Sequence, residues 1–246
     1  MLLDIHSHIL PAVDDGAKNI EASIKLLEIM QQQGITDVIA TPHFYPQSDT
    51  IEEFKERVSS SLELLNNSGV VFPNIILGCE LFYFNGISKS EFIYEFTINK
   101  SRYILLEPDF YSITKGFMEE ILYLKNEVGL IPIIPHIERY HKTRGYRAFL
   151  KFIKNNKILT QVNAASFFDK SYNRTLKKLF KNGLVTFVAT DTHSKNRPPM
   201  MDSALLEIEK RFSKIEKDRI LLNLQALYTE ITFKEDCDEI KCAEYL

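Results

Sequence analysis

Two hydrophobic patterns alternate along the chain. Short continuous apolar runs, typical of parallel strands buried on both faces, alternate with longer segments in which apolar residues recur every three or four positions, as on one side of a helix. The strand-like runs are 2–6, 36–41, 74–79, 103–106, 130–135, 158–162 and 184–190. This alternation predicts parallel strands joined by right-handed helical crossovers.

Local signals mark the ends of the expected helices. Thr50 and Glu53 form a capping-box pattern at the start of one helix, and Gly34, Gly129 and Gly183 each follow the last periodic residue of another. We expect helices over 21–33, 50–67, 88–96, 114–127, 146–156, 171–182, 202–212 and 217–228. Each strand-like run is therefore followed by a helix.

Histidine and carboxylate residues gather where the expected strands end. At or just past the ends of different runs lie His6, His43, Glu80, Glu107, His136 and Asp191, and the loops that follow contain His8, Asp15 and His193. A β/α barrel brings the C-terminal ends of its strands to one centre, whereas an open doubly wound sheet spreads them along a line. We therefore expect an α/β fold, a TIM-like barrel of seven β/α units, with a site on this rim.

The most distinctive pair is His6 and His8. Residues two apart on a strand face the same side, so both imidazoles can meet at the end of the first strand. The alternative is a pair of surface histidines, or a set of satisfied core histidines, but the positions of the other rim residues favour a metal site. Nine nitrogen and oxygen ligands without a thiolate exceed the needs of one ion and suit two or three ions of Mn, Fe or Zn type.

Composition narrows the class of protein. The chain has 246 residues with 45% hydrophobic content, no linker-like stretch and no internal repeat, which favours a single domain over 1–246. A formal net charge of −3 gives no sign of the excess positive charge that is typical of proteins that bind nucleic acid. No apolar run reaches the roughly 18 residues of a membrane span, and no signal-peptide pattern is visible, so we expect a cytoplasmic protein without membrane insertion.

The cysteines exclude one reaction mechanism. Cys79, Cys237 and Cys242 are too few and too scattered for a disulfide framework. Thiol-based tyrosine phosphatases need an arginine six positions after the cysteine, and none of the three has one. No glycine-rich nucleotide-binding motif occurs either, so nucleotide binding has no support.

The motifs together resemble a known superfamily. They are H-S-H, D-D-G, T-P-H, G-C-E, L-L-E, P-H-I-E-R-Y, Q-V-N and D-T-H-S-K-N-R-P-P, in order from Asp4 to about Met200. This series resembles the PHP (polymerase and histidinol phosphatase) superfamily and, within it, the bacterial manganese-dependent tyrosine-protein phosphatases of the CpsB type. The resemblance implies a distorted seven-stranded β/α barrel.

The resemblance also implies roles for individual residues. The first of three ions would be held by His6, His8, Glu80 and Asp191. Glu80 would bridge to a second ion, completed by Glu107 and His136, and a third would be held by Asp15, His43 and His193. Departures from the family pattern at Ser194, in the short run from His193 to Arg197, and at 44–46 affect the expected shape of the substrate site rather than the ligands.

Phosphate chemistry fits this ligand set. Divalent cations neutralise a phosphate monoester and lower the pKa of bound water toward about 7, so that hydroxide can attack phosphorus in line. The resemblance marks Arg139 and Arg197 as functionally important, and the planar fork of arginine suits a phosphate clamp. The alternatives are a surface ion pair for Arg139 and a solvated loop charge for Arg197.

Aromatic residues stand near the expected ligands and could line a cleft for a tyrosyl ring, although packing is the commoner role. They are Phe44, Tyr45, Phe82, Tyr83, Phe84, Phe110, Tyr111 and Tyr140. The resemblance implies two or three divalent ions, Mn first and Fe or Zn next, and a phosphotyrosine substrate in the tyrosine-rich tail of a bacterial kinase that controls capsule or exopolysaccharide synthesis. A small-molecule phosphatase for histidinol phosphate or a nucleotide, and a non-catalytic metal-binding scaffold, stay open as alternatives.

Overall fold

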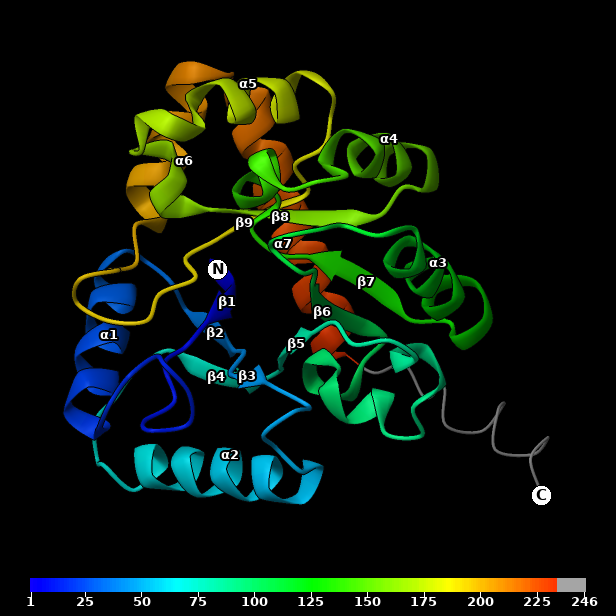
Figure 1. Ribbon diagram of the computed structural model, residues 1–246. Coiled ribbons are helices and arrows are strands. Elements are labelled where there is room, and N and C mark those ends of the chain that lie inside the picture. The colour runs from blue at the N-terminus through cyan, green and yellow to red at the C-terminus, as the bar shows by residue number, and fades with distance from the viewer. Residues whose placement is uncertain (234–246) are drawn as a thin grey trace.

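The computed structural model describes residues 1–233, in which the strands curl into a barrel with helices on the outside (Figure 1). All of the strands expected from the apolar runs are present. They are β1 (Leu3–Ser7), β2 (Asp37–Ala40), β4 (Asn74–Leu77), β6 (Tyr103–Glu107), β7 (Ile131–Ile134), β8 (Leu159–Asn163) and β9 (Phe187–Ala189). The structure adds two short strands that the pattern did not predict, β3 (His43–Phe44) and β5 (Glu80–Phe82).

The additional strands arise because two long strands bend. Thr41 and Pro42 separate β2 from β3, and Gly78 and Cys79 separate β4 from β5. A Cβ atom on Gly78 would lie 3.0 Å from Cγ2 of Ile39, so glycine permits the close approach of the two bent strands. As a result, His43 and Glu80 are the first residues of short strands rather than the residues that end long ones.

All strand pairs within the sheets are parallel, and the barrel closes between its first and last strands. One sheet has the order β1-β2-β4, and the other has the order β3-β5-β6-β7-β8-β9. Ser7 pairs in parallel with Thr192, the amide of Asp191 donates to the carbonyl of His6 at 2.8 Å, and the amide of His8 donates to the carbonyl of Thr192 at 2.9 Å. The expected distorted β/α barrel is therefore confirmed.

The helices follow their sequence signals closely. They are α1 (Ile20–Gln32), α2 (Ile51–Asn66), α3 (Lys115–Tyr123), α4 (Tyr146–Asn156), α5 (Asn173–Lys181), α6 (Met201–Arg211) and α7 (Lys214–Thr232). The predicted capping box is present, because Thr50 Oγ1 accepts from the Glu53 amide at 3.2 Å and Glu53 Oε2 accepts from the Thr50 amide at 3.3 Å. Among the described residues, no helix is both long and apolar enough to cross a membrane.

Two of the expected helices differ from the prediction. Instead of one helix over 88–96, the chain forms two 3₁₀ turns, η1 (Ile87–Lys89) and η2 (Ile93–Phe96). The amides of Gly86 and Ser88 both donate to the carboxylate of Glu120 on α3 at 3.0 Å, which ties this segment across to another element. The helix expected over 114–127 ends as α3 at Tyr123 and continues as one π-helical turn, η4 (Leu124–Val128).

Shorter 3₁₀ turns occupy connections that the hydrophobic pattern left undefined. They are η3 (Ile98–Lys100), η5 (Ile137–Lys142), η6 (Ala164–Phe167) and η7 (Lys170–Tyr172). Three of them, η5 to η7, follow β7 or β8 and so lie in loops at the C-terminal ends of strands. These loops are where a barrel carries its functional groups.

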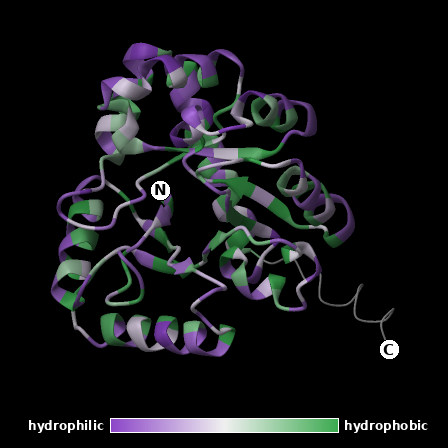
Figure 2. Ribbon diagram, in the orientation of Figure 1, coloured by the Kyte–Doolittle hydropathy of each residue, from purple (hydrophilic) through white to green (hydrophobic). Residues whose placement is uncertain are grey.

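Burial explains the two sequence patterns. The strands are mainly apolar, while the helices carry hydrophilic residues on their outer faces (Figure 2). Helix α7 lies behind the strands in Figure 1, where Asn223 donates to the carbonyl of Thr186 just before β9, and Glu230 accepts from the hydroxyl of Tyr103 at the start of β6. Since both contacts lie at strand beginnings, α7 covers the N-terminal end of the barrel and leaves the opposite end for the site.

A buried carboxylate strengthens the closure of the barrel. Asp4 on β1 is fully buried and accepts from the amide of Thr190 at 2.9 Å and from its hydroxyl at 2.5 Å. Burial raises the pKa of Asp4 from 3.8 to about 6, although both bonds from Thr190 oppose this shift. The side chain thus holds β1 next to the end of β9 at a cost in desolvation.

We expect Asp4→Ala to lower the free energy of unfolding by about 1–3 kcal/mol, because the buried donors of Thr190 lose their acceptor. Asp4→Asn keeps an acceptor and should cost less at pH 7. Because the folded-state pKa of Asp4 is raised, wild type should lose stability relative to Asp4→Asn as the pH rises from about 4 to about 6, by up to about 3 kcal/mol. Urea unfolding of both variants across this pH range measures the effect, and a pH-independent difference would contradict the role of Asp4.

Candidate metal centre and active site

The structure brings all nine predicted ligand residues to one end of the barrel. His6 lies within β1, Glu107 is the last residue of β6, and His43 and Glu80 begin β3 and β5. The others lie in the loops after β1, β7 and β9, and are His8, Asp15, His136, Asp191 and His193. Six different strands or the loops after them therefore supply the cluster.

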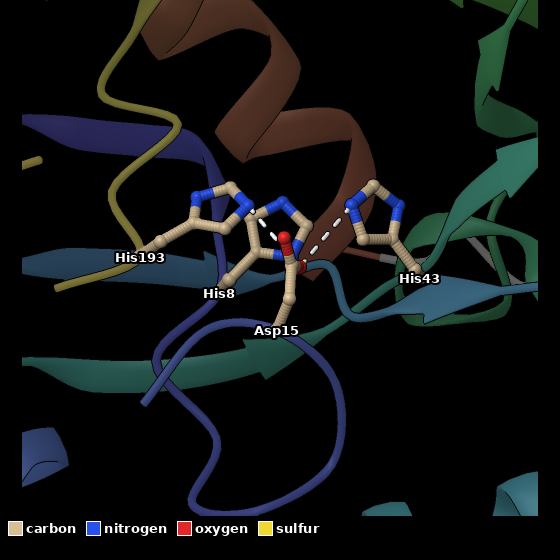
Figure 3. Close-up of side chains that lie close together, drawn as sticks. All are labelled: His8, Asp15, His43 and His193. Carbon is tan, nitrogen blue, oxygen red and sulfur yellow. Dashed lines mark ion pairs between the residues drawn. The ribbon is translucent and has the colours of Figure 1, made fainter. Parts of the chain in front are cut away.

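One group of four residues is drawn in Figure 3. His8, Asp15, His43 and His193 each offer a ligand atom within 4.8 Å of the others. Oδ1 of Asp15 lies 3.4 Å from Nε2 of His193 and 3.6 Å from Nε2 of His43. Residues from the two ends of the sequence thus lie side by side at the barrel rim, where the ring centroids of His8 and His193 are 3.9 Å apart.

Glu80 is the centre of the remaining cluster. Its Oε2 atom lies 3.1 Å from Nε2 of His6 and 3.2 Å from both Nε2 of His8 and Nδ1 of His43. Its Oε1 atom lies 2.8 Å from Nε2 of His136. A buried carboxylate with imidazoles on both oxygens is placed to bridge two cations.

Glu107 and Asp191 complete the two sides of this cluster. Oε1 of Glu107 lies 3.3 Å from Nε2 of His136. Oδ1 of Asp191 lies 3.7 Å from Nε2 of His6 and 3.6 Å from Nε2 of His8. Asp191 therefore lies on the His6 and His8 side of Glu80, and Glu107 lies on its His136 side.

Two residues of the cluster have an unusual backbone. His136 and Asp191 both have a positive φ, 32° and 49°, although neither is glycine. Such left-handed conformations cost free energy and persist where the surrounding structure enforces them. Here they turn the chain directly after β7 and β9, so that each side chain points back toward the cluster.

The electrostatics of the cluster favour anionic carboxylates. Burial alone would raise the pKa of Glu80, but His6, His136 and His8 together hold this pKa well below its usual value. Burial likewise opposes ionisation of Asp191, yet the nearby histidines lower its pKa to about 2. In return, bonds from Glu107 and Glu80 raise the pKa of His136 to about 9 against the effect of burial. The positive charge that this site needs is therefore supplied by protons or by cations.

The hydrogen bonds of the histidines fit cations. Nδ1 of His8 donates to Oδ2 of Asp14 at 2.6 Å, and Nδ1 of His193 donates to the carbonyl of Asp191 at 3.0 Å, so in each neutral ring the lone pair is on Nε2 and faces the cluster. His43 has a lowered pKa because of burial, and its buried Nδ1 makes no hydrogen bond among residues 1–233, although it lies 3.2 Å from Oε2 of Glu80. Buried lone pairs without donors are the arrangement that a divalent metal satisfies.

Both predicted arginines contact the cluster through one residue. Nη2 of Arg197 donates to Oδ2 of Asp191 at 2.8 Å, and Nη1 of Arg139 lies 3.4 Å from the same oxygen. The guanidinium of Arg139 also lies 4.8 Å from the ring centroid of Phe110. Both side chains are partly exposed and line the cavity above the ligands.

That cavity has a volume of about 270 Å³ and is lined by both arginines and by six of the nine predicted ligand residues, namely Asp15, His43, Glu80, Glu107, Asp191 and His193. Three of the eight aromatic residues considered from the sequence line it, namely Tyr45, Phe82 and Phe110. Phe44 instead packs in the core against Phe54 and Phe96. The other four aromatics, Tyr83, Phe84, Tyr111 and Tyr140, are not among the lining residues.

The sequence analysis missed residues that hold the ligands in place. Asp14 accepts from His8 and from the amide of His43 at 3.0 Å, and the hydroxyl of Tyr140 lies 3.0 Å from Nδ1 of His136. The D-D-G and P-H-I-E-R-Y motifs contained both residues, but spacing alone did not separate a ligand from its support. Cys79 is buried, and burial raises the pKa of its thiol, while Cys237 and Cys242 lie outside the described residues.

The chain resembles curated tyrosine-protein phosphatases over most of its length. The chain is 34% identical over 212 residues to the putative tyrosine-protein phosphatase CapC of Staphylococcus aureus, covering 81% of this chain and 80% of that one. It is 27% identical over 246 residues to the tyrosine-protein phosphatase YwqE of Bacillus subtilis, covering 93% and 94%.

Solved structures of other proteins have a similar fold. The crystal structures of YwqE from Bacillus subtilis and CpsB from Streptococcus pneumoniae, described as metal-dependent tyrosine phosphatases, match with a TM-score of 0.80 and 26% identity over 93% of this chain and 95% of that one. A histidinol phosphate phosphatase from Lactococcus lactis matches with a TM-score of 0.51 and 14% identity, a likeness of fold alone. The family model for capsular polysaccharide synthesis, CpsB/CapC, matches residues 2–227, and the chain belongs to this family.

Proposed function

We propose that this protein is a metal-dependent tyrosine-protein phosphatase that hydrolyses phosphotyrosine in a protein substrate. The observation that carries this proposal is one cavity in which buried imidazoles and carboxylates, two arginines and three aromatic rings meet. The relatives named as tyrosine-protein phosphatases support the same reaction.

We assign the nine rim residues as ligands of two or three divalent cations. His6, His8, Glu80 and Asp191 would hold one ion, Glu80, Glu107 and His136 a second, and Asp15, His43 and His193 a third. The distances around Glu80 and the group in Figure 3 support this division. We propose Mn²⁺ as the native ion, with Fe and Zn compatible with the same nitrogen and oxygen donors.

When bound, such cations neutralise the phosphate and lower the pKa of water so that a nucleophile is available near neutral pH. The protein's own residues then bind and orient the substrate. Arg139 and Arg197 line the same cavity and are partly exposed, so their guanidinium groups can donate to phosphate oxygens that do not contact the cations. Donors placed where negative charge develops stabilise the transition state more than the ground state.

The aromatic residues of the cavity are placed to receive the tyrosyl ring. Tyr45 and Phe82 lie next to each other with ring centroids 6.3 Å apart, and Phe110 lies beside Arg139. Planar apolar walls next to a phosphate clamp favour an aryl phosphate over a phosphorylated aliphatic alcohol. We propose these three residues as the walls of the phosphotyrosine site.

The biological setting that we propose follows from the family. The substrate would be the tyrosine-rich tail of a bacterial tyrosine kinase that regulates capsule or exopolysaccharide synthesis, in the cytoplasm. We also propose that residues 1–246 form one phosphatase domain of the PHP superfamily, although the last residues, 234–246, lie outside the described structure.

Metal removal tests the ligand assignment. The purified protein should contain two to three transition-metal ions per chain, and exhaustive chelation should abolish hydrolysis of a phosphotyrosine peptide because the buried ligands cannot activate water by themselves. Elemental analysis and turnover before chelation, after chelation and after addition of Mn²⁺ measure this. Full activity in protein shown to be free of metal would refute the mechanism, and a preference for histidinol phosphate over the peptide would refute the substrate.

The arginines test whether the site handles phosphate. Arg139→Ala and Arg197→Ala should each lower kcat/KM for phosphotyrosine by roughly 10²-fold or more, the scale for loss of one transition-state donor, with fold and metal content unchanged. Lysine at either position should restore activity only in part, since it lacks the bidentate fork. Arg219→Ala is a matched control, because Arg219 bonds to Glu216 and the carbonyl of Val185 at the other end of the barrel. Near-normal kcat/KM in both variants would mean that the arginines only form ion pairs with Asp191 and do not bind phosphate.

Cys79 tests the identity of the nucleophile. Since its thiol is buried with a raised pKa, Cys79→Ser should leave turnover largely intact, and thiol alkylation should have little effect. Steady-state kinetics of the metal-loaded variant measure this. Complete loss of activity in a folded, metal-loaded Cys79→Ser protein would mean that the reaction uses a thiolate.

A further inference from the structure

Two side-chain amides lie directly behind the proposed metal ligands. Gln161 and Asn163 are two residues apart on β8, so both point to the inside of the barrel, and both are buried. Nε2 of Gln161 donates to Oδ1 of Asn163 at 2.8 Å. Gln161 also contacts His6 and His136, and Asn163 also contacts Asp191. These three residues belong to three other strands or the loops after them.

The direction of each hydrogen bond follows from groups that can only donate or only accept. The amide N–H of His136 donates to Oε1 of Gln161 at 2.8 Å, which identifies that atom as the carbonyl oxygen. The same oxygen lies 3.2 Å from Nδ1 of His6. Because the oxygen accepts, Nδ1 of His6 must carry the hydrogen, and the lone pair of the neutral ring is therefore on Nε2.

The consequence for His6 is specific. Its Nε2 atom lies 3.1 Å from Nε2 of His8, whose own Nδ1 hydrogen is committed to Asp14. Two lone pairs then face each other at this distance, an arrangement that a cation between them satisfies. Without the oxygen of Gln161, the hydrogen of His6 could move to Nε2 and block this position.

The second amide acts on Asp191. Because Oδ1 of Asn163 accepts from Gln161, its Nδ2 is the atom that donates to Oδ2 of Asp191, at 2.5 Å. Arg197 and Arg139 approach the same Oδ2 atom. All of these N–H groups point to Oδ2 of Asp191. The other oxygen, Oδ1, therefore remains free to face His6 and His8.

The buried carboxylate of Glu138 fixes the backbone that carries these two amides. Oε1 of Glu138 accepts from the amide N–H of Asn163 at 3.0 Å and from the hydroxyl of Ser166 at 2.7 Å. Glu138 is fully buried and comes from η5, the turn that also carries Arg139. The amides are therefore fixed by the backbone of β8 and by the loop after β7.

We propose that Gln161 and Asn163 are positioning residues that set which atom of His6 and which oxygen of Asp191 are available to the metal. Hydrogen bonds of this kind raise metal affinity by fixing the ligand's orientation, and their loss typically costs 10–100-fold in affinity or activity. This inference rests on the proposed metal centre. It assigns a role to the Q-V-N motif, which the ligand set does not use.

The test compares Gln161→Met and Asn163→Leu, which keep approximate size but cannot form these bonds, with Asn223→Leu. Asn223 is a matched control because its amide also donates to a backbone carbonyl, that of Thr186, but at the N-terminal end of the barrel. We expect Mn²⁺ affinity, measured by electron paramagnetic resonance of free Mn²⁺, to fall about 10–100-fold in the first two variants and to stay near wild type in the control. The double variant should lose less than the two single losses combined, because the bond from Gln161 to Asn163 couples the two amides.

A second readout separates positioning from loss of structure. In metal-free protein labelled with ¹⁵N-histidine, long-range ¹⁵N–¹H spectra should show His6 with hydrogen on Nδ1, and Gln161→Met should populate the form with hydrogen on Nε2. Wild-type Mn²⁺ affinity in Gln161→Met, an unchanged His6 form, or an equal loss of affinity in Asn223→Leu would overturn the inference. None of these results depends on turnover, so they are distinct from a failure of the phosphatase proposal itself.

Discussion

The hydrogen bonds that join β1 to the chain just after β9 are the constraint on which the site depends. The bonds between Asp191 and His6 and between His8 and Thr192 close the barrel and also hold together the residues that we propose as metal ligands. They bring residues from the two ends of the sequence within a few ångströms, and Asp4 strengthens the same seam through Thr190. A barrel that opened here would keep most of its core but would separate His6 and His8 from Asp191 and His193.

The two carboxylate oxygens of Asp191 have different partners. One oxygen faces the histidines, and the other accepts from Asn163 and Arg197, with Arg139 nearby. The proposed cations and the phosphate clamps therefore share one carboxylate, whose left-handed backbone fixes its direction. If substrate drew the proposed phosphate clamps, Arg139 and Arg197, away from Asp191, it would weaken their hydrogen bonds to this carboxylate and would couple the two halves of the proposed site.

The strands and most helices could be predicted from the sequence, because apolar runs and capping signals are local. The gathering of the rim residues at one end of the barrel could be predicted from their positions at strand ends. The bends were not predictable in the same way. The long strands are interrupted at residues 41–42 and at residues 78–79, and the missing Cβ of Gly78 leaves room for the side chains of Ile39 and Ile98, which are far away in the sequence. Gln161 and Asn163 were visible as a motif, but their role depends on contacts with His6 and Asp191, at separations that no local pattern encodes.

We propose that the strand ends of this barrel hold a cluster of divalent cations that serves phosphotyrosine hydrolysis. Anomalous diffraction at the manganese edge from crystals of Mn²⁺-loaded protein with bound phosphate tests it most directly. We expect two or three peaks about 2.0–2.3 Å from the nitrogen and oxygen atoms around Glu80 and the His8 group, with phosphate between them and Arg139 and Arg197. Active protein whose crystals hold manganese elsewhere, with no peak among these side chains, would contradict the account.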